Sequence, residues 1–161
     1  MITLEEMIIS RGDIERIYRS DISLTLWRAV NKSNKQLTNP LYPDLNKRIL
    51  PNGRTRLADV ATYFNDDGIL FVKSEESRGT SLSDKEGLFG HKSWEYIFIP
   101  AGTNIPPELI ITKDHHIPKK NCWHYSISPN YDMPVTKFLK SLDQLAINAK
   151  IKIGVTRNAQ R

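Results

Sequence analysis

Apolar side chains recur with helical spacing at both ends of the chain. In residues 3–19 they are Leu4, Met7, Ile8, Ile14 and Ile17. In residues 135–149 they are Phe138, Leu139, Leu142, Leu145, Ala146 and Ala149. A repeat of three to four residues places one apolar stripe along a helix. Thr3 followed by Glu6 also has the spacing of a capping box, so we predict a helix at each end of the chain.

Short apolar runs between turn residues predict strands in the middle of the chain. The runs span residues 23–30, 69–72, 94–99, 109–113 and 121–127. Short helices are expected at 54–62 and at 81–88, where Ser83 and Glu86 repeat the capping-box spacing. Helices at the ends with strands between them predict an α+β fold rather than the strict alternation of a doubly wound sheet.

Polar segments separate these elements. The longest, residues 31–52, carries three prolines and is long enough to be a functional loop. Residues 74–80 and 114–120 are expected to be shorter loops. The chain has 161 residues, of which 39% are hydrophobic, and it shows no linker or internal repeat. We therefore predict a single domain spanning residues 1–161.

The formal net charge of +5 favours anionic partners, namely nucleic acid, a dinucleotide phosphate or an acidic protein. The basic residues form only short clusters, so nucleic acid is a possible partner that no motif indicates. No apolar run approaches the roughly 18 residues needed to cross a bilayer, and we expect no membrane partner. The first residues lack the pattern of a secretory signal peptide, so any export is expected to use other machinery.

Cys122 is the only cysteine and lies within an apparent strand. One cysteine permits no intramolecular disulfide, which fits a reducing compartment, and it excludes zinc sites that need two thiolates. We predict that Cys122 is a small buried side chain rather than a nucleophile. The adjacent His115 and His116 point apart on an extended chain, so we expect no metal site there.

Three local features could carry chemistry, although the residues alone favour a structural explanation for each. Arg28, near the end of an apolar strand, could grip a phosphate or be an ordinary edge-strand arginine. Thr80 and Ser81 follow Gly79 and could meet a ligand or form a turn. His124 lies between two aromatic residues, so it projects into solvent or a cleft if both aromatics face the core.

Several of these segments, taken together, resemble one family of bacterial toxins. The segments are SLTLWRAV (23–30), LYPD (41–44), DGILF (67–71), RGTSLSDKEGLF (78–89), FIPAGTNIPPELIITKD (98–114) and WHYSISP (123–129). Their order and spacing are similar to those of type VI secretion toxins of the second-exported-effector family, over about residues 20–148. The string NIPPEL after IPAGT, with HYS downstream, is the most specific part.

The resemblance implies an ADP-ribosyltransferase-like fold, with a split β-sheet core flanked by helices, that binds NAD as a substrate. It implies that type VI secretion machinery delivers the toxin from the producer's cytoplasm into the cytoplasm of a target cell. It also implies neutralisation by a cognate immunity protein. The family's functional residues correspond to Thr80, Ser81 and His124, which are therefore expected to be catalytic, and the arginine of its first strand corresponds to Arg28.

The glutamate of arginine–serine–glutamate transferases has no matching residue in this chain. It normally stands just before the apolar strand that leads into Pro-x-Gly-Thr, where this sequence has Tyr96, with Glu95 one residue away. A shift of one residue reverses the face of a strand. We expect Tyr96 or Glu95 to face the reacting centre, and Arg28, Thr80, Ser81 and Tyr96 to bind NAD.

The residues and the resemblance together predict a toxin that transfers ADP-ribose from NAD to an unidentified macromolecular acceptor. It would act mainly by positioning NAD and by stabilising developing positive charge. Two alternatives stay open. One is an NAD glycohydrolase, in which water replaces the acceptor, and the other is a non-enzymatic toxin that binds a cellular target through its basic surface.

Overall fold

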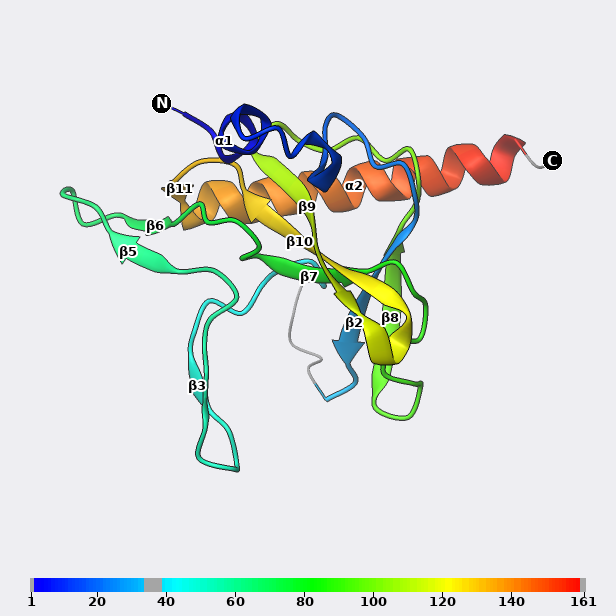
Figure 1. The fold of residues 1–161 in the computed structure, drawn as a ribbon, viewed down its shortest axis with the longest axis horizontal. Helices are drawn as coiled ribbons and strands as arrows, with labels where there is room; N and C mark the ends of the chain where they lie inside the picture. Colours follow the sequence, from blue (N-terminus) through cyan, green and yellow to red (C-terminus); the bar gives the residue numbers. More distant parts are fainter. Residues whose placement is uncertain (1, 34–38, 160–161) are drawn as a thin grey trace.

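The computed structural model describes residues 2–33 and 39–159, and Figure 1 shows their arrangement. The helices are α1 (Leu4–Ser10), α2 (Val135–Ala159) and the short 3-10 turns η1 (Ile14–Arg16) and η2 (Pro118–Lys120). The strands are β1 (Ile17–Tyr18), β2 (Leu26–Asn31), β3 (Arg48–Ile49), β4 (Thr55–Arg56), β5 (Thr62–Phe64), β6 (Leu70–Val72), β7 (Thr80–Ser83), β8 (Trp94–Ile99), β9 (Leu109–Ile117), β10 (Cys122–Pro129) and β11 (Met133–Pro134). Helices towards the ends and strands between them confirm the α+β prediction.

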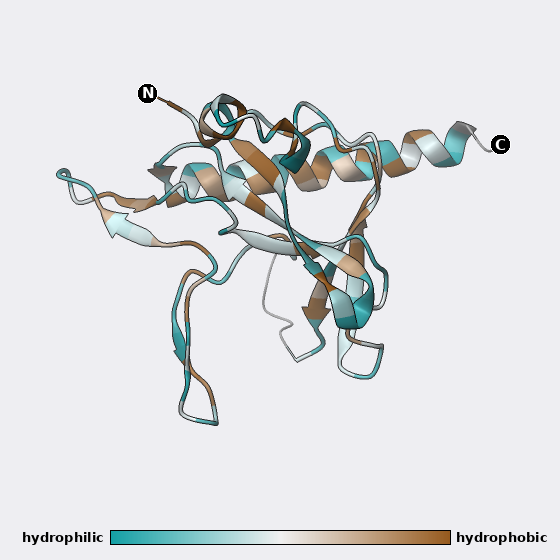
Figure 2. Ribbon diagram, viewed as in Figure 1, coloured by the Kyte–Doolittle hydropathy of each residue, from teal (hydrophilic) through white to brown (hydrophobic). Residues whose placement is uncertain are grey.

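Six strands form one antiparallel sheet in the order β1-β9-β10-β7-β2-β8. A smaller sheet has the order β11-β6-β5. Apolar and polar stretches alternate along α2, as expected for a helix with one face against a sheet (Figure 2). The main core includes Leu26, Leu82, Ile111, Tyr125 and Ile127 from the large sheet and Phe138, Leu142 and Leu145 from α2. These contacts attach α2 to the large sheet.

α1 is shorter than predicted. Its capping box is confirmed, since Thr3 Oγ1 accepts a hydrogen bond from the Glu6 backbone N–H and Glu6 Oε2 accepts one from the Thr3 N–H, both at 3.1 Å. The helix ends at Ser10, and Gly12 follows with a positive φ of 82°. A left-handed glycine is a common helix terminator. The predicted helix over 3–19 is therefore wrong beyond Ser10, where η1 and β1 follow.

A hairpin of β3 and β4 stands where the start of a helix at 54–62 was expected. Asn52 and Gly53 lie between its strands, and this residue pair favours tight hairpins. The hairpin projects from the body of the molecule (Figure 1). The rest of the predicted loop at 31–52 is mostly irregular where it is described, and residues 34–38 lie outside the described residues.

The predicted short helix at 81–88 is also wrong, because β7 occupies its start. The Ser83 hydroxyl donates to the carbonyl oxygen of Lys85 at 3.0 Å instead of capping a helix. β9 continues to Ile117 and η2 follows, so the predicted loop at 114–120 is wrong as well. These corrections place β7 inside the large sheet, between β10 and β2.

α2 extends past its predicted end at residue 149. Ala149 is the last buried residue among its described side chains, and Ile151 and Val155 beyond it are exposed. Figure 1 shows this end of α2 projecting beyond the sheet. In the described parts of the chain, no helix combines the length and the apolar character needed to span a membrane.

Candidate functional site on the central sheet

The pairing of β7 with β10 decides which face of the sheet each predicted site residue occupies. Ser81 is opposite Ser126, and Leu82 is opposite Tyr125. Leu82 and Tyr125 belong to the main core. Because neighbouring residues of a strand point to opposite faces, Ser81 and Ser126 share the other face with His124. We call this surface the serine face.

Thr80 and Arg28 point to the core face and hold the same loop segment. Thr80 is fully buried (0% exposed) and donates from Oγ1 to the carbonyl oxygen of Leu41 at 2.6 Å. Arg28 donates from Nε to the carbonyl oxygen of Pro40 at 3.2 Å and from Nη1 to that of Ser81 at 3.1 Å. Burial lowers the pKa of the Arg28 guanidinium from its ordinary value. The two residues thus attach the 40–41 segment to β7 and β2.

Tyr96 lies on the serine face, on the edge strand β8. Its hydroxyl donates to the carbonyl oxygen of Gly90 at 2.7 Å and accepts from the backbone N–H of Phe89 at 2.8 Å. Glu95 is exposed and points to the opposite face, as the offset of one residue requires. Trp27 stands on the serine face in β2, between the strands of Tyr96 and Ser81.

The structure therefore divides the predicted site residues into two groups. Ser81, His124 and Tyr96 lie on the serine face, whereas Thr80 and Arg28 lie on the core face behind it. The groups meet at β7, where the Ser81 backbone accepts the hydrogen bond from Arg28 and the Ser81 side chain faces the other way.

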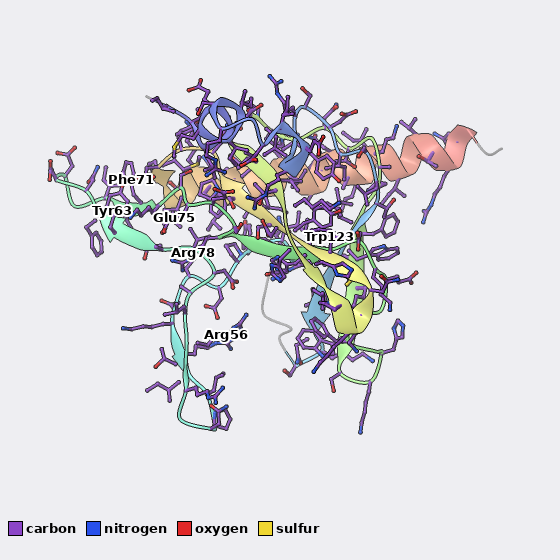
Figure 3. The ribbon with its side chains drawn as sticks, in the orientation of Figure 1. Arg56, Tyr63, Phe71, Glu75, Arg78 and Trp123 are labelled. Carbon is purple, nitrogen blue, oxygen red and sulfur yellow. The ribbon has the colours of Figure 1, made fainter. Side chains whose placement is uncertain are left out.

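The condition set for His124, that both of its aromatic neighbours face the core, is met by one of them. Tyr125 is buried, whereas Trp123 stands on the surface of β10 with 36% of its area exposed (Figure 3). Lys113 Nζ lies 4.2 Å from the centre of the Trp123 ring, and the His116 ring is 5.3 Å away. A β-bulge between His124 and Tyr125 disturbs the regular alternation at this point.

Asp114, which the sequence did not mark as a site residue, collects four hydrogen bonds beside His124. Its Oδ2 lies 2.9 Å from His124 Nδ1 and accepts from Ser126 Oγ at 2.6 Å. Its Oδ1 accepts from Thr112 Oγ1 at 2.6 Å and from Ser77 Oγ at 2.9 Å. The Asp114 side chain is only 3% exposed, compared with 23% for His124. A buried carboxylate thus forms a hydrogen bond with Nδ1 of the partly exposed imidazole.

These hydrogen bonds favour the ionised form of Asp114. Burial acts to raise the pKa of the carboxyl group, but the hydrogen bonds from His124, Ser126, Thr112 and Ser77 outweigh it, so the pKa lies below its ordinary value. An ionised carboxylate can only accept hydrogen bonds. Asp114 therefore stays ionised and accepts hydrogen bonds from the four side chains that surround it.

Cys122 and Gly79, which lie close in sequence to His124 and Thr80, have structural roles. Cys122 is buried (3% exposed), as predicted, and burial raises the pKa of its thiol. A Cβ atom added to Gly79 would overlap the backbone carbonyl oxygen of Ile127 in β10. Gly79 thus permits β10 to pass close to the start of β7. The close approach that we expected of a ligand is made by the backbone of β10.

No group of three or more histidine, cysteine, aspartate or glutamate side chains suited to a metal ion occurs within residues 2–33 and 39–159. The surface is hollowed beside Tyr18 and beside Tyr131. Neither hollow is lined by Ser81, His124 or Tyr96.

Comparison with known proteins gives two concordant matches. The family model for the Tse2 ADP-ribosyltransferase toxin matches residues 7–152. The chain is also 28% identical over 145 residues to Toxin Tse2 of Pseudomonas aeruginosa, a match that covers 79% of this chain and 88% of that protein. The residues matched by the family model include both groups of predicted site residues.

Proposed function

The chain belongs to the Tse2 ADP-ribosyltransferase toxin family, and on this premise we propose that it cleaves NAD and transfers ADP-ribose to a macromolecular acceptor. The observation that carries the proposal is the family match over residues 7–152, which spans Ser81, His124 and the sheet around them. The serine face supports it, because hydroxyl and imidazole groups can exchange hydrogen bonds with the hydroxyls of a ribose.

In the proposed reaction the bond between the ribose C1′ and the nicotinamide nitrogen breaks, and nicotinamide leaves with the bonding electrons. A nucleophilic oxygen or nitrogen of the acceptor then bonds to C1′ and loses its proton. Positive charge develops on the ribose during this exchange, so the protein acts by orienting NAD and stabilising that charge.

Each predicted residue has a place in this proposal. Ser81 orients the nicotinamide half of NAD, and His124 accepts a hydrogen bond from a ribose hydroxyl or positions the acceptor. Tyr96 faces the reacting centre. Arg28 and Thr80 lie on the core face, so their place in this proposal is to attach the 40–41 segment to β7 and thereby to position Ser81.

Release of nicotinamide from NAD by the purified protein, with a bacterial lysate as the source of acceptor, tests the proposal. Ser81→Ala and His124→Ala should each lower the rate about 10-fold to 100-fold, because each removes a hydrogen bond to the reacting ribose. The melting temperature of Ser81→Ala should stay close to that of the wild type, and His124→Ala, which removes one of the four hydrogen bonds to Asp114, is assayed well below its own melting temperature. Cys122→Ala, in the same strand as His124, is the matched control and should keep full activity. A folded wild type that releases no nicotinamide would falsify the proposal.

The fate of the ADP-ribose separates the candidate activities. With NAD labelled in its adenine half, label that becomes attached to a macromolecule supports transfer. Free ADP-ribose as the only product favours an NAD glycohydrolase instead. Full toxicity of the folded Ser81→Ala and His124→Ala variants favours a toxin that acts without cleaving NAD.

We further propose that type VI secretion delivers the protein and that it acts in the cytoplasm of the target cell. The resemblance of residues 98–114 and 123–129 to type VI secretion toxins supports this proposal. Expression in the bacterial cytoplasm should arrest growth, whereas export to the periplasm should not. Equal toxicity from both compartments contradicts the proposed site of action.

A small acidic immunity protein is the proposed neutralising partner. The net charge of +5 supports this proposal, as do Arg48, Arg54 and Arg56, which are exposed on the hairpin of β3 and β4. Figure 3 labels Arg56 on this hairpin. Complementary charge speeds and orients association. Hydrogen exchange in the complex should slow at the loops 31–52 or 74–81. Protection confined to segments remote from both loops contradicts the proposed contact.

A further inference from the structure

Two consecutive residues of β9 contact the same imidazole ring. Asp114 Oδ2 lies 2.9 Å from His124 Nδ1, and the His115 ring stacks on the His124 ring at 4.9 Å between centres, with 12° between the planes. In a regular strand, neighbouring residues point to opposite faces. Here His115 pairs with His124 and Lys113 pairs with Tyr125, which leaves Asp114 as the extra residue of the bulge. Bulges of this kind redirect side chains.

We infer that Asp114 is a positioning residue for His124: it accepts a hydrogen bond from the protonated Nδ1, so that the unprotonated Nε2 faces the ribose or the acceptor. The inference rests on the proposed function and deepens it. It gives His124 a defined tautomer and a fixed ring orientation, which a hydrogen-bond acceptor in a reacting site needs.

Asp114 acts through His124 rather than by touching NAD. Both of its oxygens already have partners, with Thr112 and Ser77 at Oδ1 and with His124 and Ser126 at Oδ2. Its side chain is almost completely buried, whereas His124 is partly exposed. The imidazole is therefore the part of this cluster that a ligand can reach.

The tautomer follows from the chemistry of the cluster. An ionised carboxylate has no proton to give, so a neutral His124 must donate its Nδ1 hydrogen to Asp114. Nε2 is then the ring nitrogen with a lone pair. The serine and threonine hydroxyls contribute by donating to the same carboxylate, which keeps the carboxylate in place.

Nitrogen NMR of the His124 side chain tests the inference directly. At about pH 8.5, above the ordinary imidazole pKa of about 6.5, the wild type should show the proton on Nδ1. In Asp114→Asn the amide oxygen should stay on the side of Thr112 and Ser77, whose hydroxyls donate, and the amide NH₂ should then face His124. The proton should move to Nε2 in that variant.

Kinetics provide the second measurement. Asp114→Asn should lower kcat for nicotinamide release about 10-fold to 100-fold with little change in KM, because the misoriented acceptor matters most in the transition state. Combining it with His124→Ala should cost no more than His124→Ala alone. Cys122→Ala, in the same strand as His124 but outside the four hydrogen bonds to Asp114, is the matched control. It should keep both the tautomer and the activity.

The outcomes separate this inference from the proposed function. A wild-type His124 that carries its proton on Nε2 overturns the inference without the need for any variant to fold. A folded Asp114→Asn with wild-type kcat overturns it as well. If the wild type releases no nicotinamide, the proposed function fails, and toxicity replaces kcat as the readout. The inference then stands if Asp114→Asn loses toxicity as His124→Ala does, and it falls if Asp114→Asn stays toxic.

Discussion

Thr80 and Ser81 are neighbours in the sequence, but their side chains meet different surroundings because β7 is a regular strand. The Thr80 hydroxyl is buried and donates to the carbonyl oxygen of Leu41, whereas Ser81 points to the serine face. Loss of the Thr80 hydroxyl strands a buried acceptor, so Thr80→Ala should lower the free energy of unfolding by about 1 to 3 kcal/mol. Activity lost by Thr80→Ala must therefore be measured together with stability.

Gly79→Ala should destabilise the protein strongly. The new Cβ would overlap the backbone carbonyl of Ile127, which cannot rotate away as a flexible side chain could, so β7 and β10 must shift apart. Such overpacking costs about 1 to 3 kcal/mol or more. Urea unfolding of the wild type and the variant measures the difference.

Gly154→Ala is the control for the glycine substitution. Nothing lies within 4 Å of a Cβ at Gly154, which is inside α2. Alanine is the better helix former, so this variant should gain roughly 0.5 to 1 kcal/mol. A Gly79→Ala variant with the urea midpoint of the wild type would show that the close approach to β10 is relaxed in solution.

At the scale of residues, strand alternation made part of the site predictable. Alternation applies only to the expectation for His124, since Ser81 was expected at the site from Gly79 and the resemblance; both lie on one face, with Ser126 opposite Ser81. Asp114 was not predictable, because a bulge places it and the sequence around it has no regular alternation. The burial of Thr80 was missed for a different reason, since its hydrogen-bond partner lies in the loop before β3.

Helices and strands were predicted well where apolar residues repeat. They were predicted poorly where glycine or small polar residues determine the backbone conformation. β8 has the expected bounds of 94–99, and α2 begins at Val135 as expected. The hairpin of β3 and β4 was missed, although Asn52 and Gly53 carried its signal. β7 was taken for the start of a helix because Ser83 and Glu86 have the spacing of a capping box and its small polar residues show no apolar alternation.

The end of α2 should be dispensable for folding. Beyond Ala149 the described side chains of α2 are not buried, so removal of residues 153–161 should change the free energy of unfolding by only about 0.5 kcal/mol. The melting temperature should then move by about 2 °C or less. Circular dichroism during heating measures both the shift and the lost helix.

Leu142→Ala provides the contrast within the same helix. Leu142 is fully buried in the main core, and such substitutions cost about 2 to 5 kcal/mol. A truncated protein that melts as early as Leu142→Ala would mean that the last turns of α2 pack against the body of the molecule.

The large sheet packs against a different helix on each of its two faces. α2 and the core face of the large sheet bury the main hydrophobic cluster, whereas α1 packs with β1 and Ile110 in a second, smaller cluster. Between them the sheet carries a buried carboxylate, Asp114, tied to four donors. Part of the stability of the fold therefore depends on the ionisation of one group.

The free energy of unfolding should fall in acid because of Asp114. Its pKa is lower in the folded chain than in the unfolded chain, so its contribution is fully present above the ordinary aspartate pKa of about 4. The contribution is lost as the pH falls through the lower folded value, because protonation removes an acceptor from His124 and the hydroxyls. Glu76, whose pKa is lowered first by its hydrogen bond with Arg11, should add to the same loss.

Urea midpoints at pH 7 and pH 3 test this prediction. Asp114→Asn should be less stable than the wild type at pH 7 and should lose less stability on acidification. Asp66→Asn, at an exposed aspartate in a turn, should lose as much stability as the wild type. Equal losses in all three proteins would show that Asp114 does not contribute to the acid sensitivity.

The burial of Cys122 protects the one thiol of the chain from oxidants. Its thiol is covered, and the raised pKa leaves little of the thiolate that peroxides and glutathione disulfide attack. The sequence has no second cysteine, so no disulfide within the chain forms or breaks when the redox potential changes. The fold therefore depends on neither an oxidising nor a reducing compartment for the state of an internal disulfide.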